Sequence, residues 1–240
     1  MTSVQGLDGQ GRRKRRLGSL THQIVQDLGK AIVTGQFSED KFPIESEICK
    51  RYDASRSIVR EAIKMLNSKG MLVARPRRGT TVRPEKEWNL LDPDILYWML
   101  NRRFSLQLLK DFTRARLAIE PAAAAEAART ATEEQRQLMR DKLAGMELAA
   151  AGKNDPLLAD IDFHLAILEA SNNPFFYSMS PMIETALRIS IQYTNRKLRQ
   201  RVASYEEHDK LLAPILARDP EAAAAESRAV LTRNLGLMES

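Results

Sequence analysis

Asp160 and His164 are four residues apart in this 240-residue chain, and their types suit metal binding. At that spacing on a helix they share one face, where a carboxylate oxygen and an imidazole nitrogen can converge on one cation. His208 is the other imidazole of the C-terminal half. Three ligands from two helices could hold a divalent metal ion inside a helical bundle. The spacing also fits a surface pair or a satisfied core pair, so both interpretations stay open.

Arg56 and Arg60 form a second set, with types and spacing that suit DNA contact. Apolar residues recur at helical spacing on both sides of a break at Asp53, which predicts a helix-turn-helix. Ser55 precedes the second helix and can cap it by accepting a hydrogen bond from an amide of the first turn. Two arginines at such a helix start can reach base edges and phosphates in the major groove. The alternative is a solvated charged face on an ordinary helical pair.

Further elements are needed to position these arginines. Residues 20–35 carry apolar residues at helical spacing and would add one more helix. Two short strands joined by a basic turn follow the helix-turn-helix, which makes the predicted domain a winged helix. The candidate DNA contacts are Ser55, Arg56, Arg60, Arg75, Arg77, Arg78 and Gly79.

Charge is distributed unevenly along the chain, whose formal net charge is +6. Residues 1–86 hold 18 Lys and Arg against 9 Asp and Glu, and the remaining residues hold 19 against 22. The positive surplus therefore lies in the half with the predicted winged helix, as contact with DNA phosphates favours. A basic run, Arg12 to Arg16, lies within residues 1–19, which we expect to be a disordered arm.

The sequence predicts neither a membrane anchor nor a disulfide framework. Apolar runs such as residues 95–100 are too short to span a bilayer, and the basic run precedes no continuous apolar segment of a signal peptide. Cys49 is the only cysteine, which excludes an intramolecular disulfide. We therefore expect a cytoplasmic protein with no membrane partner.

The C-terminal half is predicted to be almost entirely helical. Proline occupies the first helical position after Asp92, Asp155, Asn173 and Asp219. Long stretches rich in Ala, Leu, Glu and Arg, without strand-like alternation, lie between these helix starts. The expected fold is mainly α, with a winged helix-turn-helix at residues 20–84, a linker at 85–91 and an all-α bundle at 92–238.

Ordered motifs run through residues 20–84. They comprise Leu28, Ile32, Gly35, Pro43, Glu45, Glu47, Ser55, Arg56, Val59 to Ala62, Leu66, Gly70, Gly79 and Val82. With these motifs the chain resembles the GntR family of bacterial transcription regulators. One departure is Ser46, where some members carry an arginine that contacts DNA. The operator preference of those members therefore does not carry over.

A second group of motifs comprises Arg116, Glu120, Pro121, Asp160, Phe163, His164, Asn173, Pro174, Glu207 and His208. With these motifs the C-terminal half resembles the ligand-binding (FCD) domain of the FadR subfamily. The resemblance implies a divalent metal ion, such as zinc, nickel or manganese, held by an aspartate and three histidines. Asp160, His164 and His208 match that set. The last helix, around Val230, contains no histidine, so the third histidine is missing.

The resemblance also implies a small carboxylate effector beside the metal. Residues 87–98 are most similar to repressors of galactonate catabolism, so we expect a sugar acid, an aldonate such as D-galactonate. Arg116 and Asn173 are the candidate effector contacts, because a guanidinium can bond a carboxylate in bidentate fashion. Arg116 is also placed one turn before Glu120, where the two could form an ion pair instead.

The expected function is that of a homodimeric repressor that a sugar acid releases from double-stranded operator DNA. A dimer is expected because one recognition helix reads few base pairs, and two half-sites give specificity. The alternatives are a metal-dependent enzyme and an effector-independent DNA-binding protein. Against the enzyme, no recognisable nucleophile or acid–base pair accompanies the candidate site. Ligand-dependent release from one operator would distinguish the regulator from the effector-independent protein.

Overall fold

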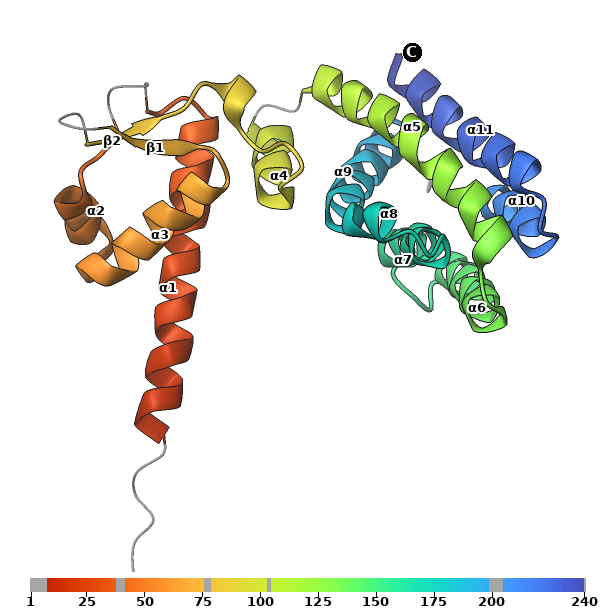
Figure 1. The fold of residues 1–240 in the computed structure, drawn as a ribbon, viewed down its shortest axis with the longest axis horizontal. Coiled ribbons are helices and arrows are strands. Elements are labelled where there is room, and N and C mark those ends of the chain that lie inside the picture. The colour runs from red at the N-terminus through yellow and green to blue at the C-terminus, as the bar shows by residue number, and fades with distance from the viewer. Residues whose placement is uncertain (1–7, 38–41, 76–78, 103–104, 199–204, 240) are drawn as a thin grey trace, which may run out of the picture. The chain divides into compact units, whose positions relative to one another are not determined.

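The computed structural model describes residues 8–37, 42–75, 79–102, 105–198 and 205–239. Within them lie eleven α-helices, a short 3-10 helix and one two-stranded hairpin, so the expected mainly helical fold is confirmed (Figure 1). The chain divides into two compact units, residues 1–103 and 104–240. None of the helices in the described ranges is both long enough and apolar enough to cross a membrane.

The first unit contains the predicted helix-turn-helix. Its helices are α1 (Asp8–Val33), α2 (Glu45–Tyr52) and α3 (Arg56–Ser68), and both α1 and α2 pack against α3. Asp53 ends α2 in the left-handed conformation, with φ 47°, which an aspartate tolerates better than most residues. The core between the helices is formed by Ile24, Leu28, Ile48, Val59 and Leu66.

The hairpin behind these helices is the predicted wing. Strand β1 (Leu72–Arg75) pairs antiparallel with β2 (Gly79–Val82), so that Leu72 lies opposite Val82 and Arg75 opposite Gly79. Leu72 and Val82 are buried and attach the hairpin to the helices. Gly79 has φ +74°, a conformation that glycine adopts without strain.

The segment expected to be a linker packs onto the first unit instead. It contains the 3-10 helix η1 (Glu85–Glu87) and then Trp88, which is 8% exposed. The Nε1 of Trp88 donates to the carbonyl oxygen of Arg83 at 2.9 Å. Gly70 lets the chain pass closely, because a Cβ there would lie 2.8 Å from the carbonyl oxygen of Glu87. Residues 85–88 are therefore held by specific contacts.

Helix α4 (Pro93–Arg102) also belongs to the first unit, although its sequence pattern predicted a place in the helical bundle. The ring of Trp98 lies against Gly29 of α1, where any side chain would collide with it. Its Nε1 donates to Oε1 of Gln26 at 2.8 Å. The division between the units therefore comes after α4. The sequence did not predict this boundary, because contacts between helices leave no trace in local periodicity.

Lys69 joins the end of α3 to the start of α4. Its Nζ donates to Oδ2 of Asp92 at 2.7 Å and to Oδ2 of Asp94 at 2.8 Å. Burial acts to lower the pKa of Lys69, but the hydrogen bonds and charges of the two carboxylates outweigh it and raise the pKa above its usual value. The cluster is therefore a partly buried ion pair with one cation and two anions.

The start of α1 differs from the expected disordered arm. The helix begins at Asp8, so residues 8–19 are helical, and residues 1–7 lie outside the described ranges. Arginine and lysine are good helix formers, which favours extension of the helix through the basic run.

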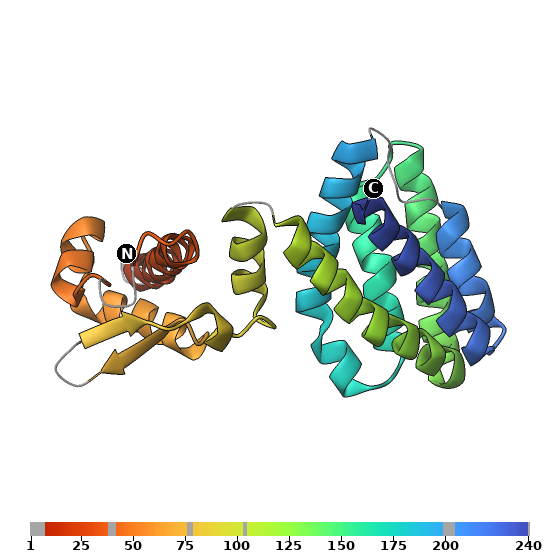
Figure 2. The same ribbon diagram turned by 90° about the horizontal axis from the view of Figure 1, so that it is seen from above.

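The second unit is a bundle of seven helices in its described part. Figure 2 shows α5 and α11 side by side, and α6 packs along α7. Helices α7 and α8 begin at the prolines predicted to start them, and so does α11. The helices are α5 (Leu106–Thr130), α6 (Glu133–Ala150), α7 (Pro156–Ala170), α8 (Pro174–Ser178), α9 (Ser180–Leu198), α10 (Tyr205–Leu216) and α11 (Pro220–Glu239).

Buried apolar residues of five helices fill this bundle. Small residues such as Ala124, Ala127 and Ala128 let α5 approach its neighbours closely. Phe163 of α7 is fully buried among them. The same helices α7 and α10 carry the candidate metal ligands, so the core fixes the helices from which those side chains project.

Candidate DNA-binding surface and metal centre

The candidate DNA-binding surface is the exposed face of α3. Arg56 opens this helix and Arg60 follows one turn later. Both side chains are exposed, whereas the residues that attach the helix to its unit, Val59, Ala62 and Leu66, are buried. The arginines are therefore accessible for base edges and phosphates, as a recognition helix requires.

Ser55 has the N-cap position of α3 but not the predicted capping bond. Its backbone is extended, with φ −67° and ψ 155°, as an N-cap needs. Its hydroxyl lies 2.9 Å from the hydroxyl of Ser57 and accepts no hydrogen bond from a helix amide. The expected capping bond is thus replaced by a pairing of two hydroxyls.

Arg60 makes an ion pair that its local spacing does not predict. Its Nε donates to Oε2 of Glu45 at 2.9 Å and to Oε1 at 3.3 Å. A shallow cavity of about 270 Å³ lies beside this pair, with Lys64 and Asn67 of α3 and Thr80 of β2 on its walls. The pair therefore stands at the junction of helix-turn-helix and wing.

The wing supplies the remaining candidate DNA contacts. Arg75 is exposed at the end of β1, and Gly79 is exposed at the start of β2. Arg77 and Arg78 lie outside the described residues. The structure thus gives a place to five of the seven candidate contacts.

The candidate metal ligands converge as predicted. Asp160 and His164 lie on α7 and His208 on α10. Nε2 of His164 is 3.5 Å from Oδ1 of Asp160, and Nε2 of His208 is 3.8 Å from Oδ2. One ligand atom from each residue lies within 4.8 Å of the others. Zinc binds nitrogen and oxygen ligands at about 2.0–2.2 Å, which requires ligand atoms separated by distances close to the 3.5 and 3.8 Å found here. The three residues therefore fit a cation after a small adjustment.

The protonation state of His164 also suits a metal. His164 is 8% exposed, His208 4% and Asp160 5%. Burial lowers the pKa of His164 to about 3, against the opposing attraction of Asp160. The imidazole is therefore neutral at neutral pH, and the neutral form is the one that coordinates metal.

A buried ion pair lies behind His164. Arg116 donates to Glu120 through Nε, and its Nη2 donates to Oε2 of the same carboxylate at 3.2 Å. That Oε2 is 3.6 Å from Nδ1 of His164, the nitrogen opposite the one that faces Asp160. Carboxylates at this position commonly orient a metal-binding imidazole. The pair therefore supports the geometry of the candidate site, and the ion-pair alternative for Arg116 is realised.

A small cavity of about 30 Å³ opens beside the three ligands. A water molecule needs roughly 10–15 Å³ of such space, so the cavity has room for an ion and a water molecule. Arg116, Glu207 and Asn234 contribute polar groups to its wall. Val230 of α11 lies on the same wall, at the place where the FCD pattern led us to expect a third histidine.

Asn173 serves the start of α8. Its side chain accepts a hydrogen bond from the amide of Phe175 at 3.0 Å, which is the capping bond expected before a proline-initiated helix. Asn173 is not among the residues that line the 30 Å³ cavity. The effector contact expected of it therefore has no support from its position.

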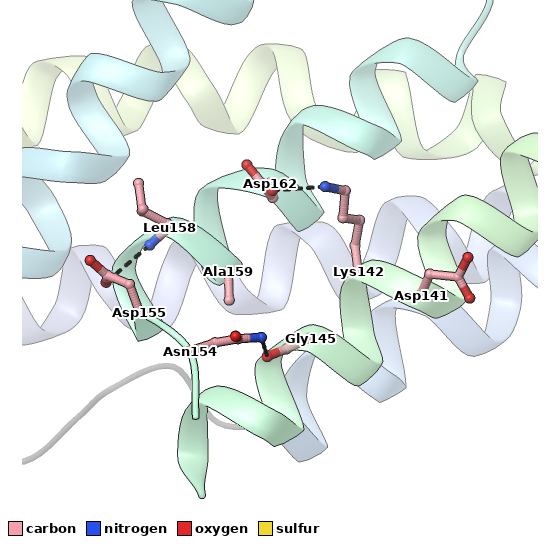
Figure 3. Close-up of a pocket in the computed structure, with 8 residues that line it drawn as sticks. All are labelled: Asp141, Lys142, Gly145, Asn154, Asp155, Leu158, Ala159 and Asp162. Atoms are coloured by element: carbon pink, nitrogen blue, oxygen red, sulfur yellow. Dashed lines mark hydrogen bonds and ion pairs between the residues drawn. The ribbon is translucent and has the colours of Figure 1, made fainter. Parts of the chain in front are cut away.

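A larger cavity, of about 340 Å³, lies between α6 and α7 on the other side of α7 (Figure 3). Asp162 points to Lys142 there, at 2.7 Å, as its place on the helix face away from His164 predicts. Asp155 caps α7, and Asn154 donates to the carbonyl oxygen of Gly145 at 3.4 Å. Asp162 and Lys142 thus pair with each other, and Asp155 and Asn154 bond the backbone, so this cavity is not the candidate site.

Local spacing missed the partners that come from other helices. Glu45 stands 15 residues before Arg60, and Asn234 lies on the last helix. Glu120 was visible as an i,i+4 partner of Arg116, but its approach to His164 was not. The only signal in the sequence was a glutamate, Glu120, within a helix that is otherwise rich in alanine.

Comparison with known protein families gives two matches. Residues 20–82 match the model described as "Bacterial regulatory proteins, gntR family", and residues 111–233 match the FCD domain. The candidate DNA contacts lie in the first match and the candidate metal ligands in the second. These matches indicate a transcription regulator rather than an enzyme.

Two related transcription regulators align with most of the chain. The chain is 31% identical to the galactonate operon transcriptional repressor of Escherichia coli K12 over 85% of this chain and 90% of that protein. It is 30% identical to YieP, an uncharacterised HTH-type transcriptional regulator of the same strain, over 89% and 93%. Similarity over such lengths includes both units.

Solved structures agree in fold. The structure of Lar, which controls the expression of the Listeria monocytogenes agr system, covers 99% of both chains with a TM-score of 0.59 and 13% identity. The structure of McbR/YncC of E. coli covers 92% of this chain and 97% of that chain with a TM-score of 0.51 and 20% identity. At these identities the likeness concerns the fold alone.

Proposed function

Because the chain belongs to the GntR family of bacterial regulatory proteins and carries an FCD domain, it is a transcriptional regulator, and we propose that a small sugar acid releases it from its operator. The galactonate operon repressor among its relatives suggests an aldonate as the effector. The observation that carries the proposal is the buried cluster of Asp160, His164 and His208 beside the guanidinium of Arg116.

A metal ion at this cluster would act as the anchor for a hydroxycarboxylate. Three protein ligands leave coordination positions for the carboxylate and hydroxyl oxygens of an aldonate. Arg116 donates to Glu120 through Nε and Nη2. Its Nη1 could then donate to the carboxylate of the aldonate. The cavity of about 30 Å³ is too small for a six-carbon acid, so its wall must open when the acid enters.

Release from DNA then follows from linkage. An effector shifts the protein away from the operator only if it binds the operator-free form more tightly. The coupling is reciprocal, so operator DNA must weaken effector binding by the same factor. This reciprocity separates a regulator from an effector-independent DNA-binding protein, for which the two affinities do not depend on each other.

The experiment measures metal content and effector affinity together. The protein is purified without chelator, its zinc, nickel and manganese are quantified, and D-galactonate and related aldonates are titrated by calorimetry. The same titrations are made with His164→Ala and with the control Asp162→Asn, which changes the neighbouring exposed carboxylate. We expect bound metal and aldonate binding in the wild type and the control, and loss of both in His164→Ala.

A different result would remove the site from the proposal. If the wild type lacks metal, gains none on incubation, and binds the effector as tightly as His164→Ala does, the three residues only pack the bundle. The search for the effector site would then begin at Arg116.

We also propose a homodimer as the DNA-binding form. A recognition helix such as α3 contacts few base pairs, so selection of one operator in a genome requires two half-sites. Light scattering at micromolar concentration should give twice the chain mass of 27.1 kDa. A monomer that binds a single half-site would contradict this proposal.

A further inference from the structure

Glu45 is an acidic residue on the surface that carries the candidate DNA contacts. It is the first residue of α2 and lies against Arg60 of α3, with one carboxylate for one guanidinium. A carboxylate close to DNA phosphates is repelled by them and lowers the affinity for every sequence. A role of Glu45 in discrimination between DNA sequences would explain its presence on this surface. Specificity is a difference between two affinities, so it can increase while the affinity for all DNA falls.

The geometry of the ion pair leaves the two terminal amino groups of Arg60 available for DNA. Both hydrogen bonds to Glu45 use Nε of Arg60, at 2.9 and 3.3 Å, so this carboxylate does not engage the two terminal amino groups. Those amino groups are the donors that can bond O6 and N7 of a guanine together. The side chain of Arg60 is 62% exposed, so they are accessible from solvent.

The pair also joins two helices. Glu45 and Arg60 are 15 residues apart and stand on opposite sides of the turn at Asp53. An unrestrained arginine on a helix surface populates many rotamers and loses that freedom when it binds a base. A carboxylate fixed on the preceding helix reduces this loss, because it selects one group of rotamers before DNA arrives.

We propose that Glu45 is a positioning residue for sequence recognition, which holds Arg60 so that its terminal amino groups meet the guanine of one G·C pair in each half-site. The inference rests on the proposed role of Arg60 in DNA contact. Glu45 touches the arginine and not the base.

The test compares base preference rather than affinity alone. Full-length wild type, Glu45→Ala, Glu45→Gln and Arg60→Ala are each used to select sites from a library of random double-stranded DNA. Affinity for the wild-type site and for an unrelated duplex is then measured by fluorescence anisotropy at fixed salt. The central quantity is the ratio of the two affinities, together with the base pair at which each variant loses preference.

We expect Glu45→Ala to lower this ratio about tenfold, as loss of one well-oriented base contact does. The lost preference should fall on the same base pair as in Arg60→Ala. Gln keeps one oxygen that can accept from Nε, so Glu45→Gln should lie between the wild type and Glu45→Ala. A change in charge alone would give the same result for both Glu45 variants.

Glu61→Gln is the matched control. Glu61 is exposed on α3 beside Arg60 in sequence, and its carboxylate faces Lys64 at 4.0 Å. The substitution removes one negative charge near the DNA without touching the Glu45 pair. We expect both affinities to rise and their ratio to stay constant. Circular dichroism and melting curves verify that each variant is folded.

Two outcomes would overturn the positioning role. If Glu45→Ala tightens all DNA and keeps the ratio, as the control does, then Glu45 only repels phosphates. If it loses preference at a base pair other than the one lost by Arg60→Ala, then Glu45 contacts a base directly. A third outcome concerns the premise: unchanged selection by Arg60→Ala would remove Arg60 from recognition, and the inference about Glu45 with it.

Discussion

Arg60 in the first unit and Arg116 in the second each pair with a glutamate, but in opposite surroundings. The side chains of Arg60 and Glu45 are 62% and 39% exposed, whereas those of Arg116 and Glu120 are 1% and 7% exposed. Water can replace either partner of the first pair, so that pair contributes little to stability and can be remodelled by a ligand. Neither partner of the buried pair can lose the other without a desolvated charge being left behind.

Stability should separate the two pairs most strongly. Arg116→Ala leaves Glu120 buried without its cation, so we expect a loss of about 3–5 kcal/mol in the free energy of unfolding. Arg60→Ala should change the same quantity by no more than about 0.5 kcal/mol, because its site is exposed. Urea unfolding at neutral pH measures both variants.

The double variant Arg116→Met with Glu120→Leu provides the control for this prediction. It removes both charges together and should recover most of the lost stability, because no unpaired charge remains. If the single variant Arg116→Ala is as stable as the wild type, the buried pair described for the second unit is not formed.

The second prediction concerns metal as a stabiliser of the buried site. Zinc at one hundred times its dissociation constant should raise the free energy of unfolding by about 2.7 kcal/mol if only the folded state binds it. Asp160→Asn should abolish this gain, because it removes the charged ligand shared by His164 and His208. Asp162→Asn changes an exposed carboxylate on the opposite face of α7 and should keep the gain. An equal gain in all three proteins would show that zinc binds elsewhere.

The third prediction returns to the exposed face of α3. Arg56→Ala should weaken operator binding by about 1–3 kcal/mol at fixed salt and leave the unfolding midpoint unchanged, because the side chain is exposed and we propose that it contacts DNA. A mobility-shift titration with a selected site measures the effect. Affinity equal to that of the wild type would remove Arg56 from the DNA-contacting set.

The smallest effect is expected at Lys69, whose burial is intermediate between the two pairs. Its side chain is 13% exposed, and its raised pKa means that Asp92 and Asp94 stabilise the charged form. This contribution is complete below the ordinary lysine pKa of 10.5 and is lost as the pH rises through the higher folded value. We expect Lys69→Met to cost about 1 kcal/mol at neutral pH.

A pH series of thermal melts measures this difference. The gap between the wild type and Lys69→Met should begin to close at pH 10.5, where the unfolded lysine loses its proton, and should be gone once the pH has passed the higher folded pKa. A gap that stays constant at high pH would mean that the lysine acts through its methylene groups alone.

Local patterns were sufficient for the elements and for part of each site. Helical spacing predicted α2, α3 and the shared face of Asp160 and His164, because i,i+4 neighbours are set by the helix itself. Asp-Pro and Asn-Pro pairs predicted the starts of α4, α7, α8 and α11 correctly. These features depend on residues within one or two turns.

Contacts between helices were not predictable in the same way. The approach of Glu120 to His164, and that of Trp98 to Gly29, depend on crossing angles and separations that no single segment encodes. Ile44 illustrates the limit within a segment: it stands one helical turn before the buried Ile48, but it precedes α2 and is 61% exposed. The periodicity of apolar residues predicts which side chains share one face of a helix, but packing against other elements determines whether that face is buried.

The contact between Trp98 and Gly29 has a consequence for how such regulators can be recombined. A chimera joined after the wing, at about residue 84, would take α4 from one parent and α1 from the other. Any residue larger than glycine at position 29 would then collide with the indole, and loss of Gln26 would leave its Nε1 without the acceptor it has here. The exchangeable DNA-reading cassette of this protein therefore extends to Arg102, and a junction beyond that residue preserves the α1–α4 contact.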